Sequence, residues 1–133
     1  MSETPSRSVA ELADRLFGAI ETSDIATVQH LFSPDITVLN SGNDKPNGHD
    51  RAVRTIAWFI NATVERHYEI LDRHLFDGGF VQQHVLHATG RAGASIAMRA
   101  CISIKLDEEG LIRRIDEYFD PAQMAPLLTE RQR

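Results

Sequence analysis

Two hydrogen-bonding side chains interrupt an otherwise apolar strand pattern. Phe80, Gln82, His84 and Leu86 alternate along residues 80–88, so they share one face of a predicted strand. A face that only packs would be apolar throughout, because a buried polar group costs free energy unless it is hydrogen-bonded. The pattern therefore indicates a polar site set into an apolar interior.

Glu117 is the acid that we expect to partner His84. It lies in the last predicted strand, residues 111–119, among alternating apolar positions. A carboxylate within hydrogen-bond reach of an imidazole favours the imidazolium and holds one tautomer, which gives a group that exchanges protons near neutral pH. We therefore predict a His84–Glu117 acid/base pair, with Asn40 and Gln82 orienting a water or a substrate carbonyl.

Two alternatives stay open for these residues. A His and a Glu on a sheet also form structural ion pairs, either buried or at a solvated rim. A register error of one residue swaps the faces of a strand, and the opposite face would then present Gln83, Val85 and His87 to the interior.

Hydrophobic periodicity predicts the elements that position these residues. Apolar residues at helical spacing predict helices over residues 9–20, 25–32 and 53–64, and the last two have Asp24 and Asp50 as N-caps. From Tyr68 onward the period changes to two, which is typical of strands. The predicted strands are residues 36–39, 68–76, 80–88, 96–106 and 111–119.

The order of these elements predicts the fold class. Two helices, a strand and a third helix precede four antiparallel strands, and this order is typical of an α+β domain whose helices cover one face of a curved sheet. Residues 40–48 read as a loop and residues 123–128 as a short amphipathic tail. We assign residues 1–7 to a flexible N-terminal leader and residues 8–133 to a single domain.

Composition and charge exclude several classes of protein. The 133 residues are 42% hydrophobic and 25% charged, with a net charge of −5, which is ordinary for one globular domain. The single Cys101 allows no internal disulfide, and a negative net charge argues against a nucleic-acid surface. Apolar runs are too short to span a membrane, and we expect a cytoplasmic protein.

The remaining chemistry-bearing residues give weaker signals. The six His residues lack the spacing of a metal site, so no metal is predicted. Trp58 is expected to pack or to close the mouth of a pocket. Cys101 is expected to be a small buried or interface residue.

Two segments carry a resemblance to a known superfamily. They are Leu31-Phe32-Ser33-Pro34-Asp35-Ile36-Thr37-Val38 after the second helix and Glu117-Tyr118-Phe119-Asp120-Pro121 at the end of the last strand. With the order of elements, they make the chain resemble the nuclear transport factor 2-like superfamily, in particular its SnoaL-like branch. The resemblance implies a cone-shaped fold, the cystatin-like α+β barrel, in which a curved antiparallel sheet and three helices enclose a pocket.

This fold hosts isomerases, epoxide hydrolases, polyketide cyclases and non-catalytic binding domains, so it does not by itself select a reaction. Gapless matching to ketosteroid isomerases places their three catalytic groups at Leu16, Asn40 and Ile102. None of these side chains can perform the corresponding role, because two cannot donate a hydrogen bond and an amide is no base near neutral pH.

Matching to the limonene-epoxide hydrolases keeps more of the pattern. Their water-holding Asn falls at Asn40, their bridging Arg at Gln82 and their two carboxylates at His84 and Glu117, so two of the four groups differ. SnoaL-like cyclases use an acidic residue as general acid/base, and the resemblance implies that role for Glu117 or its neighbour Asp116.

Two hypotheses about function follow. The first is a small cofactor-independent enzyme that uses general acid/base catalysis, of the isomerase, cyclase or hydrolase type, on a small apolar molecule. The second is a non-catalytic ligand-binding or dimerisation module of the same fold. The predicted catalytic residues are His84, Glu117 and Asn40. The predicted substrate-binding residues are Gln82, Leu16, Trp58, Ile102, Ile115 and Phe119.

We also predict a homodimer. The odd-numbered face of the strand over residues 96–106 carries the small side chains Ala97, Cys101 and Ser103, and such a face can accept a partner sheet. The other expected partner is a small apolar ligand or substrate, and no cofactor, nucleic acid or membrane is expected.

Overall fold

The computed structural model describes the backbone of residues 5–131 and the side chains of residues 8–129. Residues 1–4 of the predicted leader, residues 1–7, lie outside the described part, and the first helix starts at Pro5. The helices are α1 (Pro5–Glu21), α2 (Ile25–Leu31), α3 (His49–Ala62), the 3-10 helix η1 (Pro121–Met124) and α4 (Ala125–Arg131). The strands are β1 (Phe32–Asn40), β2 (Asn43–Asn47), β3 (Thr63–Phe76), β4 (Gly79–Gly90), β5 (Ser95–Leu106) and β6 (Ile112–Phe119).

The strands form one six-stranded sheet in the order β2-β1-β6-β5-β4-β3. It is mixed where the sequence predicts an antiparallel sheet, because β1 and β6 run parallel while the other pairs are antiparallel. A parallel pair needs a long connection, and here α3 and the whole β3–β5 meander supply it. The predicted α+β class is confirmed, and the sheet stays open between its β2 and β3 edges.

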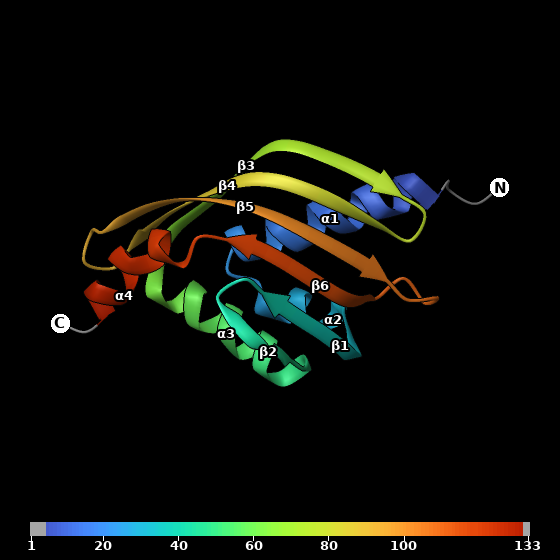
Figure 1. The fold of residues 1–133 in the computed structure, drawn as a ribbon, viewed down its shortest axis with the longest axis horizontal. Helices are drawn as coiled ribbons and strands as arrows, with labels where there is room; N and C mark the ends of the chain where they lie inside the picture. Colours follow the sequence, from blue (N-terminus) through green and yellow to red (C-terminus); the bar gives the residue numbers. More distant parts are fainter. Residues whose placement is uncertain (1–4, 132–133) are drawn as a thin grey trace.

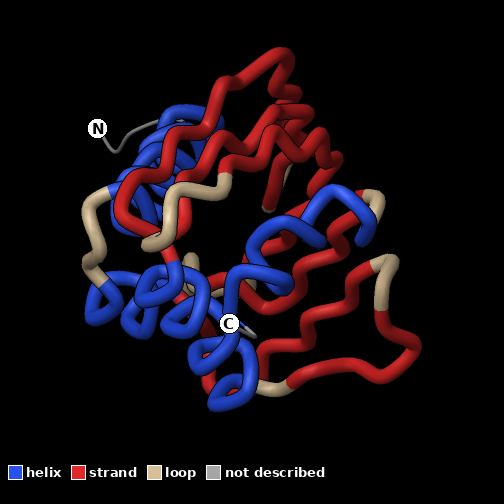
Figure 2. Tube along the Cα trace, turned by 90° about the vertical axis from the view of Figure 1, so that its left-hand side faces the viewer, coloured by secondary structure: helices blue, strands red, loops and turns tan. Residues whose placement is uncertain are grey.

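The sheet curves over the helices that cover one of its faces, as Figures 1 and 2 show. The apolar stripe predicted for α1 is buried against that face, including Leu16, Phe17 and Ile20. Register shifts in β1 and in β3 mark irregularities of the kind that bend strands. The C-terminal tail, predicted as a short amphipathic segment, forms η1 and α4, which add a fourth α-helix to the three predicted.

Strand alternation follows the sequence pattern in β4 and β5. The even-numbered residues of β5 from Ile96 to Ile104 are buried, and the residues between them are exposed or half-buried. Gln82 and His84 share this inward face and are almost fully buried, with exposed fractions of 0% and 1%. The alternative that Gln83, Val85 and His87 face the interior is therefore wrong.

β2 lies within the segment that the sequence predicts as a loop. Asn43–Asn47 pairs with β1, although it contains Pro46 and several turn-forming residues. As the edge strand it tolerates a proline, because one side of an edge strand needs no hydrogen-bond donor. Pairing with β1 is a tertiary contact that local sequence does not reveal.

Arg66 of β3 joins the C-terminal ends of two helices. Its Nε donates to the carbonyl of Ile20 in α1 at 2.8 Å, and its Nη1 donates to the carbonyl of Ile60 in α3 at 3.1 Å. Helix C-termini leave carbonyls without partners, so a cation here stabilises both. This contact holds the start of β3, and with it Tyr68, against the helices.

None of the described helices is long and apolar enough to cross a membrane.

Candidate functional site

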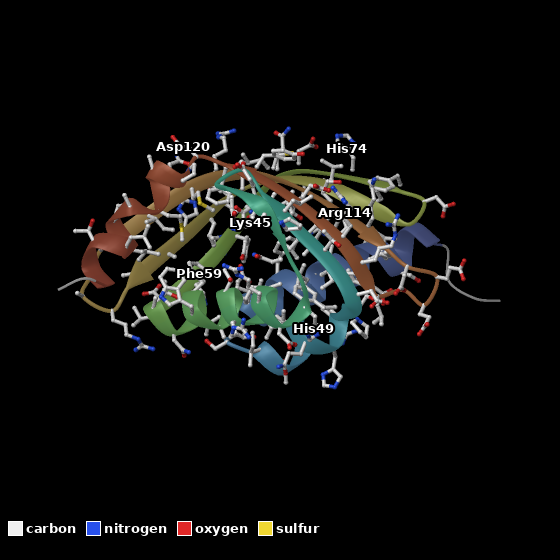
Figure 3. All side chains as sticks on the ribbon, turned by 60° about the horizontal axis from the view of Figure 1, so that its bottom comes forward. Lys45, His49, Phe59, His74, Arg114 and Asp120 are labelled. Carbon is white, nitrogen blue, oxygen red and sulfur yellow. The ribbon has the colours of Figure 1, made fainter. Side chains whose placement is uncertain are left out.

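A cavity with two lobes lies between the inward face of the sheet and helices α1 and α3. The lobes measure about 130 Å³ and about 170 Å³. Both are lined by Ile20, Asn40, Thr55, Ile56, Tyr68 and Glu117. Figure 3 shows side chains projecting into the space between these layers, with Phe59 labelled on α3 and Lys45 on β2.

We name each lobe after a residue that lines that lobe and not the other. The Asn47 lobe is further lined by Leu16, Phe17, Phe32, Val38, Asn47, Ala52, Ile102 and Ile115. The Trp58 lobe is further lined by Trp58, Phe59, Leu86, Met98, Phe119 and Met124. Most of these side chains are apolar, so the few polar groups of the cavity stand in a poorly solvated setting.

A larger groove of about 510 Å³ lies outside this cavity, beside α3 and the start of β3. Its two cations already serve the fold: Arg66 donates to helix carbonyls, and the Nε of Arg91 donates to the carbonyl of Asn61. Among the described residues that line the groove there is no carboxylate or imidazole, so the central cavity is the better candidate for acid/base chemistry.

Glu117 is the carboxylate of the cavity. β6 places it opposite Ile102 of β5 on one side and opposite Asn40 of β1 on the other. Protein surrounds it, yet it keeps partial accessibility because it opens onto both lobes. Burial raises the pKa of Glu117 from 4.5 to about 7, since an apolar setting disfavours the charged form. Near neutral pH this group can therefore either accept or give a proton.

Tyr68 of β3 is a hydrogen-bond donor in the same cavity. Burial is the main cause that raises its pKa, and the negative charges of Glu117 and then Glu21 raise it further. Its phenol therefore stays protonated at physiological pH. The ring is fixed by contacts with Phe17, at 4.8 Å between centroids, and with His84, at 5.0 Å.

Asn40 lies beside Glu117 across the β1–β6 pair. Its Oδ1 accepts a hydrogen bond from the backbone N–H of Gly42 at 3.2 Å, which holds the amide. The NH₂ group is then the part of Asn40 that can donate to a molecule in the cavity. Glu117, Tyr68 and Asn40 together offer one proton-transfer group and two donors.

His84 belongs to a separate network that runs inward from the exposed Asp14 to the buried Gln82 and His84. Asp14 pairs with Arg73 Nη1 at 2.9 Å, Arg73 Nε donates to Gln82 Oε1 at 2.8 Å, and Gln82 Nε2 lies 2.8 Å from His84 Nδ1. Because Gln82 Oε1 accepts from Arg73, its Nε2 donates, so His84 Nδ1 accepts and the ring proton sits on Nε2. Burial, and then the charge of Arg73, lowers the pKa of His84 to about 4.

The structure does not bring His84 and Glu117 together as a pair. Both face inward, but His84 lies opposite Ala100 and Glu117 opposite Ile102, so β5 separates them. His84 is neutral where the predicted pair needs an imidazolium, and among the described residues its side-chain hydrogen bond is to Gln82. It supports the ring of Tyr68 instead of meeting the carboxylate.

The other predicted site residues lie either in the wall of the cavity or in the buried core. Leu16, Ile102 and Ile115 line the Asn47 lobe, and Trp58 and Phe119 line the Trp58 lobe. Gln82 is fully buried within the Arg73–His84 network and lines neither lobe.

Sequence reasoning missed three polar residues of the cavity: Tyr68, Thr55 and Asn47. The hairpin that turns at Asp77-Gly78 would in regular register pair Tyr68 with His87, which faces outward. A register shift between Ile70 and Asp72 pairs Tyr68 with the inward-facing Leu86 instead, and local sequence does not reveal that shift. Asn47 lies in the segment predicted as a loop and gave no signal. Within the described residues, no group of three or more His, Cys, Asp or Glu side chains could hold a metal ion.

Comparison with known proteins gives one family match. Residues 13–115 match the family model of the SnoaL-like domain. No curated protein matches the chain significantly.

Solved structures of the same fold are numerous. An LEH-like epoxide hydrolase from M. tuberculosis is 16% identical over 95% of this chain and 93% of its own, with a TM-score of 0.77. PrhC from Penicillium brasilianum NBRC 6234 is 13% identical over 97% and 93%, with a TM-score of 0.83. A proposed SnoaL-like polyketide cyclase from Shewanella putrefaciens CN-32 is 17% identical over 96% and 99%, with a TM-score of 0.78. At these identities the likeness concerns the fold alone.

Proposed function

The chain belongs to the SnoaL-like domain family, and from that premise we propose that it is an enzyme that enolises a small, mainly apolar carbonyl compound in the central cavity. Glu117 is the general base, and Tyr68 and Asn40 bind the carbonyl oxygen. The observation that carries the proposal is a carboxyl group with a pKa of about 7 that opens onto an apolar cavity, which a protonated phenol also lines. A general base works best with a pKa near the operating pH.

The proton and electron movements balance within these groups. The Glu117 carboxylate takes a proton from the carbon next to the carbonyl, and the C–H electron pair forms an enolate. Tyr68 and Asn40 donate hydrogen bonds to the oxygen that gains charge, which is the strongest kind of stabilisation such a site can offer. The protonated Glu117 then returns the proton to another carbon, which is an isomerisation. In a cyclisation, the enolate carbon attacks a second carbonyl and the new alkoxide takes the proton.

This chemistry is favoured over epoxide opening by two carboxylates. Among the described residues that line the two lobes, Glu117 is the one carboxylate, and His84 is neutral and outside the lining. One group with a pKa near 7 and two neutral donors suits enolisation, which needs a base and an oxygen site. The proposed reaction uses these side chains and takes no cofactor.

The size of the cavity limits the substrate to one or two rings. Each lobe, at about 130 Å³ and about 170 Å³, is comparable to a cavity of roughly 150 Å³ that accepts benzene. The two lobes share six lining residues, so one molecule can extend through both.

Hydrogen–deuterium exchange at a ketone tests the proposal. The wild-type protein is incubated with 1-tetralone in D₂O, and loss of the proton signal at the carbon next to the carbonyl is followed by NMR. We expect catalysed exchange whose rate increases as pH rises through about 7, because Glu117 must be ionised. Glu117→Gln should lose about 100-fold or more, the usual contribution of general base catalysis.

Asp116→Asn is the matched control. Asp116 neighbours Glu117 but forms a two-bond pair with Arg114, at 2.9 and 3.1 Å, and lines neither lobe. Its exchange rate should equal that of the wild type. If Glu117→Gln exchanges as fast as the wild type, the proposed enzyme is refuted. Binding of 1-tetralone without exchange in the wild-type protein would favour the alternative, a non-catalytic ligand-binding module.

We also propose that the protein is a homodimer that packs through the outer face of the sheet. On this face Glu69 of β3 and Arg99 of β5 flank Val85 of β4 in register. A two-fold axis along β4 places the β3 strand of one copy over the β5 strand of the other, so that the acidic and basic side chains meet.

Sedimentation at micromolar concentration tests the dimer. We expect a dimer for the wild type and a monomer for Val85→Arg, because that change puts a charge at the centre of the interface. A wild-type monomer at this concentration would refute the proposed dimer without affecting the proposed reaction.

A further inference from the structure

Asn47 carries a buried polar group that the proposed reaction does not use. It is 8% exposed, lines the Asn47 lobe, and its Oδ1 has no hydrogen-bond partner among the described residues. A buried acceptor without a partner is costly, and most buried polar side chains in proteins are satisfied. The Asn47 amide therefore has hydrogen-bonding capacity that the fold leaves unused, at a residue that lines the cavity.

The local fold does not account for the amide. Asn47 precedes the start of α3, where asparagine often caps a helix, but Gly48 is the N-cap and no side-chain cap bond forms there. As the last residue of β2 its backbone pairs with Val38, a contact that any side chain permits. An apolar residue at this position would pack without an unpaired polar atom, so structure alone gives no reason for asparagine.

Asn47 and Glu117 lie apart in the same cavity. Asn47 of β2 pairs with Val38 of β1, which in turn pairs with Ile115 of β6. Glu117 of β6 pairs with Asn40, which lies two residues beyond Val38 on the same inward face of β1. The two polar residues are therefore separated by two strand spacings and one two-residue step, on the order of 10 Å between backbones. The wall between them is made of apolar side chains, Val38 and Ile115 among them.

We propose that Asn47 is a specificity-determining residue that binds a hydroxyl group of the substrate, at the end opposite the reacting carbonyl. The proposal rests on the proposed function for the position of that carbonyl at Glu117 and Tyr68. It defines the substrate class as a hydroxylated ketone of one or two rings, with an apolar segment between its two polar ends.

A hydroxyl fits this place better than other polar groups. Rotation of the Asn47 amide exchanges its oxygen and its NH₂, and a hydroxyl can both donate to the first and accept from the second. A ketone or ether can only accept. A carboxylate or phosphate finds no cation among the described residues lining the lobe, and it would meet the charge of Glu117.

Binding of matched ketones tests the proposal. Dissociation constants are measured by NMR titration for 1-tetralone and for its 5-, 6- and 7-hydroxy derivatives, with the wild type and with Asn47→Leu. We expect at least one hydroxy isomer to bind about 10-fold more tightly than 1-tetralone to the wild type. Asn47→Leu should abolish that preference.

Two further variants keep the result interpretable. Asn43→Ala changes an exposed asparagine of the same strand and should keep the wild-type preference. Asn47→Ala repeats the test should Asn47→Leu fail to fold. The proposal is overturned if no hydroxy isomer binds the wild type better than 1-tetralone, or if the preference survives in the Asn47 variants. Failure of the proposed function appears instead as absent deuterium exchange, which is measured separately from affinity.

Discussion

The pH dependence of the free energy of unfolding tests whether the surroundings of Glu117 are apolar enough to raise its pKa. Burial raises the pKa of Glu117 from 4.5 to about 7, so the folded state binds more protons than the unfolded state between these values. The free energy of unfolding must then fall as pH rises through this window. At about 1.4 kcal/mol for each pH unit, the loss is at most about 3.5 kcal/mol, and water in the cavity reduces it toward about 2 kcal/mol.

His84 contributes with the opposite sign. Its pKa is lowered from 6.5 to about 4, so the folded state binds fewer protons than the unfolded state between these values. The free energy of unfolding therefore rises as pH rises from about 4 to 6.5. The contributions of Glu117 and His84 to the pH dependence of the free energy of unfolding largely cancel between pH 4.5 and 6.5. A substitution at one of these two residues should therefore reveal the pH dependence that the other contributes.

Urea unfolding of the wild type and of Glu117→Gln, at half-unit steps from pH 4.5 to 8.5, measures the effect. The stability of Glu117→Gln relative to the wild type should increase by about 2–3 kcal/mol between pH 4.5 and 7.5 and then level off. His84→Gln should show the reverse dependence at lower pH. A difference between Glu117→Gln and the wild type that does not change with pH would refute the raised pKa and the general-base argument built on it.

Three further predictions concern neighbouring contacts. Tyr68→Phe should slow deuterium exchange of 1-tetralone about 100-fold in the NMR assay, since one oxyanion donor is lost, while its thermal stability stays near that of the wild type. Arg73→Met should lower the free energy of unfolding in urea by about 1–3 kcal/mol, because it leaves the buried Gln82 Oε1 without its donor. The pKa of His84 followed by NMR should rise, because the nearby charge is removed. Gly79→Ala should destabilise the protein by more than 2 kcal/mol in the same unfolding assay, because an added Cβ would collide with the backbone oxygen of Ile104 and the ring of Phe76.

Much of the architecture was predictable because the spacing of apolar residues, and the burial that follows from it, are local properties of a strand or helix. The alternation around Ile102 predicted the inward face of β5, and the pattern around His84 placed Gln82 and His84 inside. The helical stripe that ends at Ile20 predicted the buried side of α1. Glu117 was selected by the same alternation, and it lines the cavity.

The sequence alone determined which side of each element faces the interior, and the tertiary structure decided which of those inward residues meet. Alternation says nothing about the order of strands in a sheet, and β5 lies between the strands of His84 and Glu117. Each intervening strand adds about 4.8 Å, so two spacings prevent direct contact between short side chains. The same strand order, with β1 parallel to β6, puts Asn40 beside Glu117. The edge strand β2, which pairs with β1, places Asn47 in the wall of the cavity.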